Sequence, residues 1–160
     1  MKNVFITGGA GFIGSHCAVS LSKNGFTPII LDNFSNSHQS IIKKLEIITN
    51  KKITFYKIDI RDKKKLRLIF KKHSCYAVIH CAGFKAVEES IEKPISYFDN
   101  NIGSTLSLLE CMQENKVFKL IFSSSATVYD DNQSLPLRET SKTGNTKNPY
   151  GATKYIIEKI

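Results

Sequence analysis

Short apolar runs alternate with longer amphipathic stretches along the 160-residue chain. The apolar runs predict β-strands, at residues 2–7, 26–32, 53–59, 76–83 and 119–125. The amphipathic stretches have apolar residues at helical spacing and predict helices, at residues 12–24, 38–49, 62–72, 94–112 and 148–160. In the first helix this spacing turns Phe12, Ile13, Cys17 and Leu21 inward. Pro94 and Pro149 are each expected near the start of a helix.

The alternation of strands and helices predicts an α/β fold with a doubly wound parallel sheet and helices on both faces. The predicted strands are continuous apolar runs, as expected when both faces of a sheet are buried. One long polar stretch, residues 130–149, interrupts the pattern. A loop of this length inside a compact domain is more often functional than a plain linker, so we expect it to contribute to function. Without further strands, the fifth strand is expected to be a sheet edge.

Composition and charge narrow the class of protein. A hydrophobic content of 41% indicates a globular domain, and no apolar run approaches the roughly 18–20 residues that span a bilayer. The start, "MKNVFITGGAGFIGS", indicates a strand followed by a glycine turn rather than a signal peptide, so a cytoplasmic location is expected. The net charge is +9, which raises nucleic-acid binding as an alternative. In "IIKKLEIITNKK" and "RDKKKLRLIFKKH", however, the lysines alternate with apolar residues, which is typical of the solvated face of an amphipathic helix.

The cysteines and histidines do not form a metal motif. The four cysteines, Cys17, Cys75, Cys81 and Cys111, contain no CxxC pair, and the four histidines do not complete a ligand spacing. Reduced, mostly buried thiols without metal or disulfide are therefore expected.

A glycine-rich turn joins the first predicted strand to the first helix. The stretch "FITGGAGFIGS" places Gly8, Gly11 and Gly14 there, where the absence of side chains lets a pyrophosphate approach the helix N-terminus. The next strand ends in Asp32, which can accept hydrogen bonds from the adenosine ribose hydroxyls. Because a carboxylate there repels a 2′-phosphate, the pattern predicts NAD rather than NADP.

The next two strand ends carry further candidates for the cofactor site. Asp59, in "KIDIRD", is placed to hold the adenine edge, since Asp62 is the better helix N-cap. The fourth strand ends in "HCAGFKAV", where the small residues Ala82 and Gly83 suit a backbone that passes close to a cofactor. Lys85 suits either a phosphate contact or a solvated position.

Near the end of the sequence, a tyrosine and a lysine stand four residues apart. Tyr150 and Lys154 in "YGATK" share one face of the last predicted helix. A lysine ammonium beside a phenol favours the phenolate, so Tyr150 is predicted to act as a base. A serine hydroxyl from "FSSSATVY" is expected to bond the same substrate oxygen. A surface Tyr–Lys pair is the alternative, but the glycine turn and the serine strand end together favour catalysis.

Taken together, the motifs resemble the extended short-chain dehydrogenase/reductase family, in its branch of nucleotide-sugar 4-epimerases. The matching stretches are "TGGAGFIGSH", "ILDNFSNS", "DIRD", "VIHCAGFKAVEESIEKP", "YFDNNIGST", "FSSSATVY" and "NPYGATKYIIE". Nucleotide-sugar dehydratases of the family are expected to carry Asp-Glu after the fifth-strand serine or threonine. Here Ala126 and Thr127 follow Ser125, which argues against dehydration and for redox epimerisation.

The resemblance implies an NAD-binding Rossmann domain over residues 1–160 and assigns roles to individual positions. Ser125 would be the catalytic serine, Tyr150 the general base, and Lys154 the residue that binds the nicotinamide ribose and tunes Tyr150. The implied cofactor contacts are Gly8, Gly11, Phe12, Ile13, Gly14, Asp32, Asn33, Phe34, Ser35, Asn36, Ser37, Asp59, Ile60, Cys81, Ala82, Gly83, Phe84, Lys85, Asn100, Tyr150 and Lys154.

The implied activity is the NAD-dependent interconversion of UDP-glucose and UDP-galactose through a 4-keto intermediate. Family members are homodimers with a second, substrate-binding domain after the tyrosine helix, so the sequence is expected to be part of a longer enzyme. Ile156, Ile157 and Ile160 are expected to seek a partner. An NAD-binding module without turnover and an epimerase for N-acetylated or uronic sugars remain alternatives. One residue departs from the family pattern: Asp130 stands where a glycine is usual.

Overall fold

The computed structural model describes residues 1–130 and 132–160, so Asp131 of the predicted polar loop lies outside the described residues. The chain forms two compact units, each described by itself. The first comprises Met1–Ala82 and Leu106–Ser123, and the second comprises Gly83–Thr105 and Ser124–Ile160.

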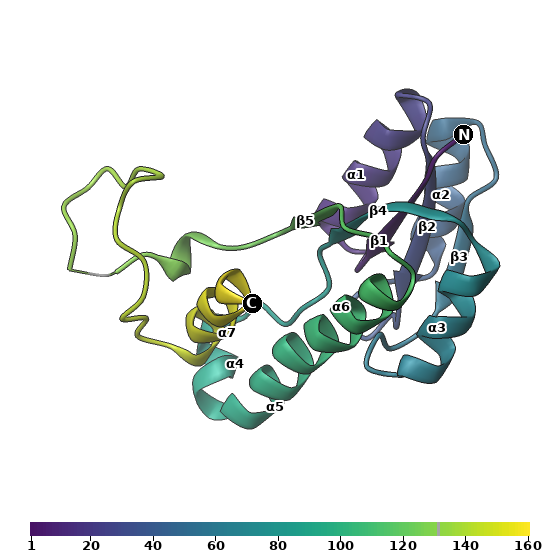
Figure 1. Cartoon of the computed structure of the whole chain (residues 1–160). Coiled ribbons are helices and arrows are strands. Elements are labelled where there is room, and N and C mark those ends of the chain that lie inside the picture. The colour runs from purple at the N-terminus through teal and green to yellow at the C-terminus, as the bar shows by residue number, and fades with distance from the viewer. Residues whose placement is uncertain (131) are drawn as a thin grey trace. The chain divides into compact units, whose positions relative to one another are not determined.

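The first unit is built on a parallel five-stranded sheet (Figure 1). Its strands are β1 (Asn3–Thr7), β2 (Thr27–Asp32), β3 (Thr54–Lys57), β4 (Cys75–His80) and β5 (Leu120–Phe122). They lie in the order β3-β2-β1-β4-β5, with β1 between β2 and β4. This arrangement confirms the predicted α/β fold with a parallel sheet.

Helices cover both faces of this sheet. The helices are α1 (Phe12–Lys23), α2 (Ser40–Thr49), α3 (Lys63–Lys72) and α6 (Ser104–Glu114), whose first two residues belong to the second unit. Along β1, Phe5 joins a buried cluster with side chains of α3 and α6, whereas the next residue, Ile6, joins a cluster with side chains of α1 and α2. Both faces of the strand are therefore buried, which explains why its sequence is a continuous apolar run.

The packing of α1 differs from the prediction. Phe12 and Ile13 are 78% and 56% exposed rather than inward. Cys17 and Leu21 are half-buried and pack against the core, as predicted, but the fully buried residues of the helix are the small Gly14, Ala18 and Ser22. Small side chains let the helix backbone approach the sheet closely. A prediction based on the spacing of large apolar residues does not detect such a face.

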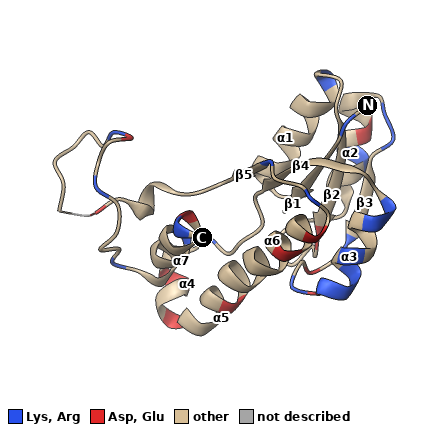
Figure 2. Ribbon diagram, viewed as in Figure 1, with Lys and Arg blue, Asp and Glu red and all other residues tan. Residues whose placement is uncertain are grey.

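Lysines and arginines gather on the outside of α3 (Figure 2). Two of these cations pair with acids of α6: Lys63 with Glu110 and Arg67 with Glu114, each at 2.6 Å. Lys64, Lys65, Lys71 and Lys72 are exposed. The structure therefore agrees with a solvated helix face as the origin of this basic run.

The second unit is helical and departs from the predicted pattern. It contains α4 (Val87–Glu92), α5 (Pro94–Phe98), the π-helix η1 (Asp99–Gly103), the 3₁₀-helix η2 (Ala126–Val128) and α7 (Pro149–Lys159). Pro94 and Pro149 begin α5 and α7, as predicted. The single α-helix predicted at 94–112 is interrupted by η1, and α4 was not predicted because six residues are too few to show a helical period.

The edge of the sheet is formed by a shorter strand than predicted. β5 spans only Leu120–Phe122 and lies at the sheet edge, as expected, with Ile121 64% exposed. Ile156 of α7 and Ile160, the residue after the helix, are exposed, but Ile157 is buried, so it does not seek a partner. Within the described residues, no helix is long and apolar enough to cross a bilayer.

Candidate functional site

The glycine turn of the first unit is shaped so that side chains are excluded from it. Gly8 has φ +65°, and a Cβ there would lie 2.7 Å from the backbone nitrogen of Ala82. A Cβ on Gly14 would lie 2.3 Å from the carbonyl oxygen of Gly8. The N-cap of α1 is Gly11, which offers no side-chain acceptor to the first N–H groups of the helix. The turn therefore presents backbone N–H groups at a helix N-terminus, a geometry that suits a phosphate.

Asp32, at the carboxyl end of β2, connects this turn to the loop that follows the strand. Its Oδ2 accepts a hydrogen bond from the N–H of Ala10 at 2.9 Å. Its Oδ1 accepts from the N–H of Phe34 at 2.8 Å and from the hydroxyl of Ser37 at 2.9 Å. The side chain is buried. Asp32 thus holds two predicted parts of the cofactor site in one arrangement.

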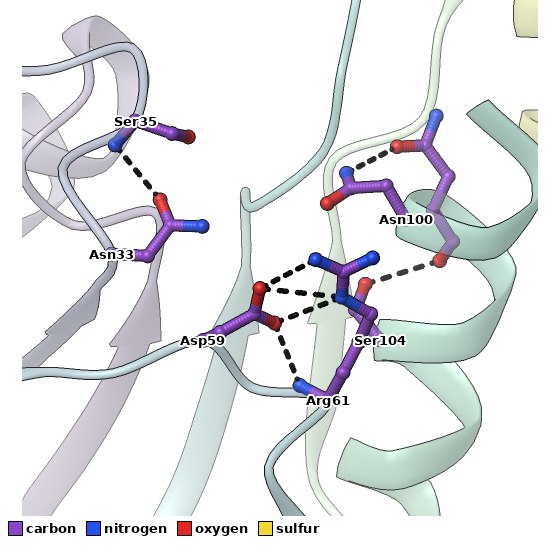
Figure 3. Close-up of polar contacts among 7 residues, drawn as sticks. Asn33, Ser35, Asp59, Arg61, Asn100 and Ser104 are labelled. Atoms are coloured by element: carbon purple, nitrogen blue, oxygen red, sulfur yellow. Dashed lines mark hydrogen bonds and ion pairs between the residues drawn. The ribbon is translucent and has the colours of Figure 1, made fainter. Parts of the chain in front are cut away.

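The loop after β2 contains the other predicted ribose contacts. Asn33 Oδ1 accepts a hydrogen bond from the N–H of Ser35 at 3.0 Å (Figure 3). Phe34 has φ +58°, and its ring lies edge-on to Phe55 with centroids 6.2 Å apart. Asn36 is exposed. The loop is therefore a tight turn held by its own polar side chains.

At the end of β3, Asp59 has a partner that the sequence did not reveal. Its carboxylate accepts from the backbone N–H of Arg61 at 3.0 Å and from Arg61 Nη2 at 2.6 Å (Figure 3). The Arg61 hydrogen bond lowers the pKa of Asp59 from its ordinary value. Asp62 caps α3, as predicted, by accepting from the N–H of Lys65 at 3.1 Å. Ile60, between them, is buried.

The carboxyl end of β4 is tied to that of β1. The N–H of Cys81 donates to the carbonyl of Thr7 at 3.0 Å, and the N–H of Ala82 approaches the Thr7 hydroxyl at 3.4 Å. That hydroxyl also lies 2.6 Å from Nδ1 of the buried His80. Neither Thr7 nor His80 was a predicted site residue, although each is a polar residue within an apolar run.

In the second unit, Asn101 connects three segments that carry predicted residues. Its Oδ1 accepts from the N–H of Phe84 at 2.8 Å, and its Nδ2 donates to the carbonyl of Phe84 at 3.1 Å and to Thr153 Oγ1 at 3.0 Å. The side chain of the predicted neighbour Asn100 donates to Asn101 Oδ1 at 3.0 Å (Figure 3). Asn101, which was not among the predicted site residues, is therefore the more connected asparagine. It lies in the π-helix, and its carbonyl accepts a hydrogen bond from the Ser104 hydroxyl at 3.2 Å.

Tyr150 and Lys154 lie in α7, as predicted, and both are buried, at 8% and 5% exposed. Lys154 Nζ is 6.0 Å from the centroid of the Tyr150 ring. A Cβ on Gly83 would lie 3.8 Å from Lys154 Nζ, so this predicted glycine passes close to the lysine. Lys85 is exposed. A buried phenol beside a buried ammonium is a suitable arrangement for proton transfer.

Ser125 is anchored beside the same helix. Its Oγ accepts from the N–H and the hydroxyl of Thr127 at 3.2 and 2.9 Å. The carbonyl of Thr127 is so close to α7 that a Cβ on Gly151 would lie 2.8 Å from it. One residue earlier, the Ser124 hydroxyl donates to Glu158 of α7. The predicted serine, tyrosine and lysine are thus parts of one packed unit.

Asp130, the departure from the family pattern, organises the loop that follows Ser125. Its N–H donates to the carbonyl of Lys142 at 3.0 Å, and its Oδ1 accepts from the N–H of Asn132 at 2.9 Å. The Asn132 backbone bond lowers the pKa of Asp130 from its ordinary value. Tyr129 pairs with Thr143 in an isolated antiparallel bridge. The polar loop is therefore held closed at its base.

The geometry agrees with comparisons to known proteins. Residues 4–160 match the sequence model of the NAD dependent epimerase/dehydratase family. The chain is 49% identical over 160 residues to a UDP-glucose 4-epimerase of Neisseria meningitidis, covering 100% of this chain and 47% of that protein. It is 45% identical to the mouse UDP-glucose 4-epimerase over 166 residues, again covering 100% of this chain and 48% of the relative.

Solved structures give the same result. The fold matches the UDP-glucose 4-epimerase of Bifidobacterium longum in complex with NAD⁺ and UDP, with a TM-score of 0.97 and 45% identity, covering 99% of this chain and 47% of the other. It also matches the UDP-Glc/GlcNAc 4-epimerase of Campylobacter jejuni, with a TM-score of 0.93 and 32% identity, covering 99% of this chain and 47% of that one. The chain spans about half the length of the relatives it matches.

Proposed function

The chain belongs to the NAD dependent epimerase/dehydratase family, and from this membership we propose that it is the cofactor-binding and catalytic part of a UDP-glucose 4-epimerase. The observation that carries this proposal is the buried Tyr150–Lys154 pair packed in one unit with Ser125. The similarity to UDP-glucose 4-epimerases over the whole chain supports the same reaction. Because those relatives are about twice as long, the complete activity is proposed for the whole protein.

The first unit has a backbone that suits NAD. At Gly8 and Gly14, an added Cβ would meet the protein's own backbone at 2.7 and 2.3 Å, so only glycine lets the turn fold this tightly at the start of α1, where free N–H groups suit a pyrophosphate. Asp32 has two oxygens with about four acceptor positions, of which three are used within the protein. We therefore expect a ribose hydroxyl to take the remaining position or to replace Ser37. The exposed Phe12 and Ile13 are proposed to lie over the pyrophosphate.

The second unit supplies the groups that move the proton. When bound, NAD⁺ would accept a hydride from carbon 4 of the sugar and later return it to the opposite face. Tyr150 removes the proton from the sugar 4-hydroxyl and returns it after the 4-keto sugar has turned over. Lys154 stabilises the phenolate through its positive charge, and Ser125 donates a hydrogen bond to the sugar oxygen. Ala126 and Thr127 provide no carboxylate after Ser125, which supports epimerisation over dehydration.

The assembly and location are proposed on narrower grounds. A homodimer that uses α7 and the residue after it is supported by the exposed side chains of Ile156 and Ile160. A cytoplasmic location is supported by the four cysteines, which are all free thiols. The geometry of the glycine turn and Asp32 favours one second candidate function, an NAD-binding module that binds the cofactor without turnover.

The two functions are separated by measuring NAD binding and sugar conversion on the same protein. Calorimetry is expected to show NAD binding to the wild type and none to Gly14→Ala, since the added methyl group clashes with Gly8. Conversion of UDP-galactose to UDP-glucose is then assayed for the wild type and Tyr150→Phe. Conversion that Tyr150→Phe abolishes supports the epimerase, and NAD binding without conversion supports the module. Absence of NAD binding to a folded wild type would overturn both.

A further inference from the structure

A groove runs between α1 and α2 on the outside of the first unit. Its volume is about 550 Å³, within the range of roughly 300–1,000 Å³ that ligand sites occupy. None of its lining residues belongs to the cofactor or catalytic sets described above. The groove therefore has no role in the proposed reaction, although it is large enough to hold a partner.

The floor of the groove is apolar and comes from both helices. α1 contributes Val19, and α2 contributes Ile41, Leu45 and Ile48. The α2 residues are spaced i, i+4 and i+7, which places them along one face of the helix. Leu45 is 2% exposed, but Ile48 is 58% exposed. This face packs against α1 at its base and leaves apolar surface uncovered along its rim.

The rim carries cations on both sides. Lys23 of α1 and Lys44 of α2 line the groove together with neutral polar side chains and His16. Within residues 1–130 and 132–160, neither lysine forms an ion pair with a carboxylate, and no acidic side chain lines the groove. The one acid of the two helices, Glu46, accepts a hydrogen bond from the N–H of Ile53. The groove is therefore positive on both flanks of an apolar floor.

This distribution of charge selects a class of occupant. A small amphiphile with a single acidic headgroup would need cations gathered at one end, whereas Lys23 and Lys44 come from opposite walls. A helix with an apolar stripe and carboxylates on both sides of it matches both walls at once. On α1 the lining runs over residues 15–24, or about 15 Å at 1.5 Å per residue, which suits two to three turns of such a helix. We propose that the groove between α1 and α2 binds an acidic amphipathic helix of a partner protein.

The direct test uses a synthetic helix as the probe. The probe is a fluorescein-labelled peptide of about four turns, with leucines along one stripe and glutamates on both flanks; a matched peptide carries lysines in place of the glutamates. Fluorescence anisotropy with the 160-residue protein is expected to show saturable binding of the glutamate peptide that weakens as salt is raised, and no binding of the lysine peptide. Absence of glutamate-peptide binding, or equal binding of both peptides, would overturn the proposal.

Adjacent residues on α2 provide matched variants. Lys44→Glu is expected to weaken binding about tenfold, corresponding to about 1.4 kcal/mol, while Lys43→Glu makes the same charge change outside the groove and leaves affinity within about twofold. Ile48→Ser is expected to weaken binding similarly, whereas Ile47→Ser, at a more exposed position outside the lining, is not. Circular dichroism checks that all four variants remain folded. Equal effects of Lys43→Glu and Lys44→Glu would refute the assignment of the groove.

A third probe separates a peptide site from a lipid-like site. Dodecanoate is titrated against the wild type and Lys44→Glu by calorimetry. The proposal expects at most weak binding that Lys44→Glu barely changes, because one headgroup contacts one wall. Saturable dodecanoate binding that depends on Lys44, combined with no response to the glutamate peptide, would show that the occupant is a small amphiphile and overturn the proposal.

Discussion

Replacing Asp32 with asparagine tests how the cofactor edge of the sheet is held. The side chain keeps its shape, but one oxygen becomes an NH₂ group. At the Oδ2 position, that group faces the N–H of Ala10, and at the Oδ1 position it faces the N–H of Phe34. Either orientation places two donors against each other in a buried site, so at least one backbone N–H loses its acceptor.

The magnitude follows from the three bonds that Asp32 accepts. Hydrogen bonds to a charged group contribute about 1.5–3 kcal/mol each, and a neutral amide keeps the remaining ones at about 1 kcal/mol. Loss of one bond and weakening of the others gives a destabilisation of about 3 kcal/mol. For a protein of this size, that lowers the melting temperature by about 6–12 °C. Ser37→Ala removes one partly exposed bond and is expected to cost only about 1 kcal/mol.

Thermal unfolding followed by circular dichroism measures the total effect, and amide hydrogen exchange locates it. In Asp32→Asn, exchange at Ala10 and Phe34 is expected to accelerate together, because the same carboxylate holds both segments. Ser37→Ala leaves the Ala10 bond intact and should leave its exchange unchanged. If Asp32→Asn were no more destabilising than Ser37→Ala, or if Ala10 kept its protection, the carboxylate would not be the link between the glycine turn and the loop.

Three further predictions concern other parts of the chain. Asn101→Leu removes four side-chain hydrogen bonds at a position 2% exposed and is expected to destabilise the second unit by about 3 kcal/mol in urea titrations, with faster amide exchange at Phe84. Asn101→Gln keeps the amide but lengthens the side chain, so it measures how far this stability depends on the position of the amide. The hydrogen bond from the Asn132 N–H lowers the pKa of Asp130 in the folded state below its ordinary value of 3.8. The ionised Asp130 therefore contributes its full stabilisation above pH 3.8, and this stabilisation is lost as the pH falls through the lower, folded-state pKa. Asp130→Asn should remove this acid dependence, measured as amide exchange in the loop. Burial raises the pKa of Cys75 to about 11, so mass spectrometry should find it alkylated by iodoacetamide near neutral pH far more slowly than free cysteine.

The sequence predicted the parts of the fold that depend on local pattern. β1 and β2 are continuous apolar runs because each is buried on both faces, and their order along the chain predicts parallel pairing. The glycine turn and Asp32 were found for the same reason, since backbone freedom and an acid at a strand end leave a mark at fixed positions. The predicted helix cap at Asp62 is equally local, since its side chain accepts the backbone N–H three residues on.

What the sequence did not show depends on contacts between distant segments. Asn101 resembles any polar residue in a helix until its bonds to Phe84 and Thr153 are seen, because those partners are far from it in sequence. Phe12 and Ile13 were wrongly placed inward because the residues that α1 buries fully, among them Gly14 and Ala18, suit close approach to the sheet and add little apolar area. The pairing of Arg61 with Asp59 was not predicted, because oppositely charged residues two apart in the sequence are usually both solvated.

Asn101 is a buried residue of the long helical segment that the π-helix η1 interrupts. Asn101 lies four residues after Tyr97 and four before Thr105, and all three are buried, so ordinary helical spacing already places it on the inward face. Asn101 accepts a hydrogen bond from the N–H of Phe84 and donates to the carbonyl of Phe84 and to the hydroxyl oxygen of Thr153. Thr153 belongs to α7, the helix that carries Tyr150 and Lys154. Helical spacing alone does not name the partners of that side chain, which lie 17 and 52 residues away in the sequence and are found only once the backbone is known.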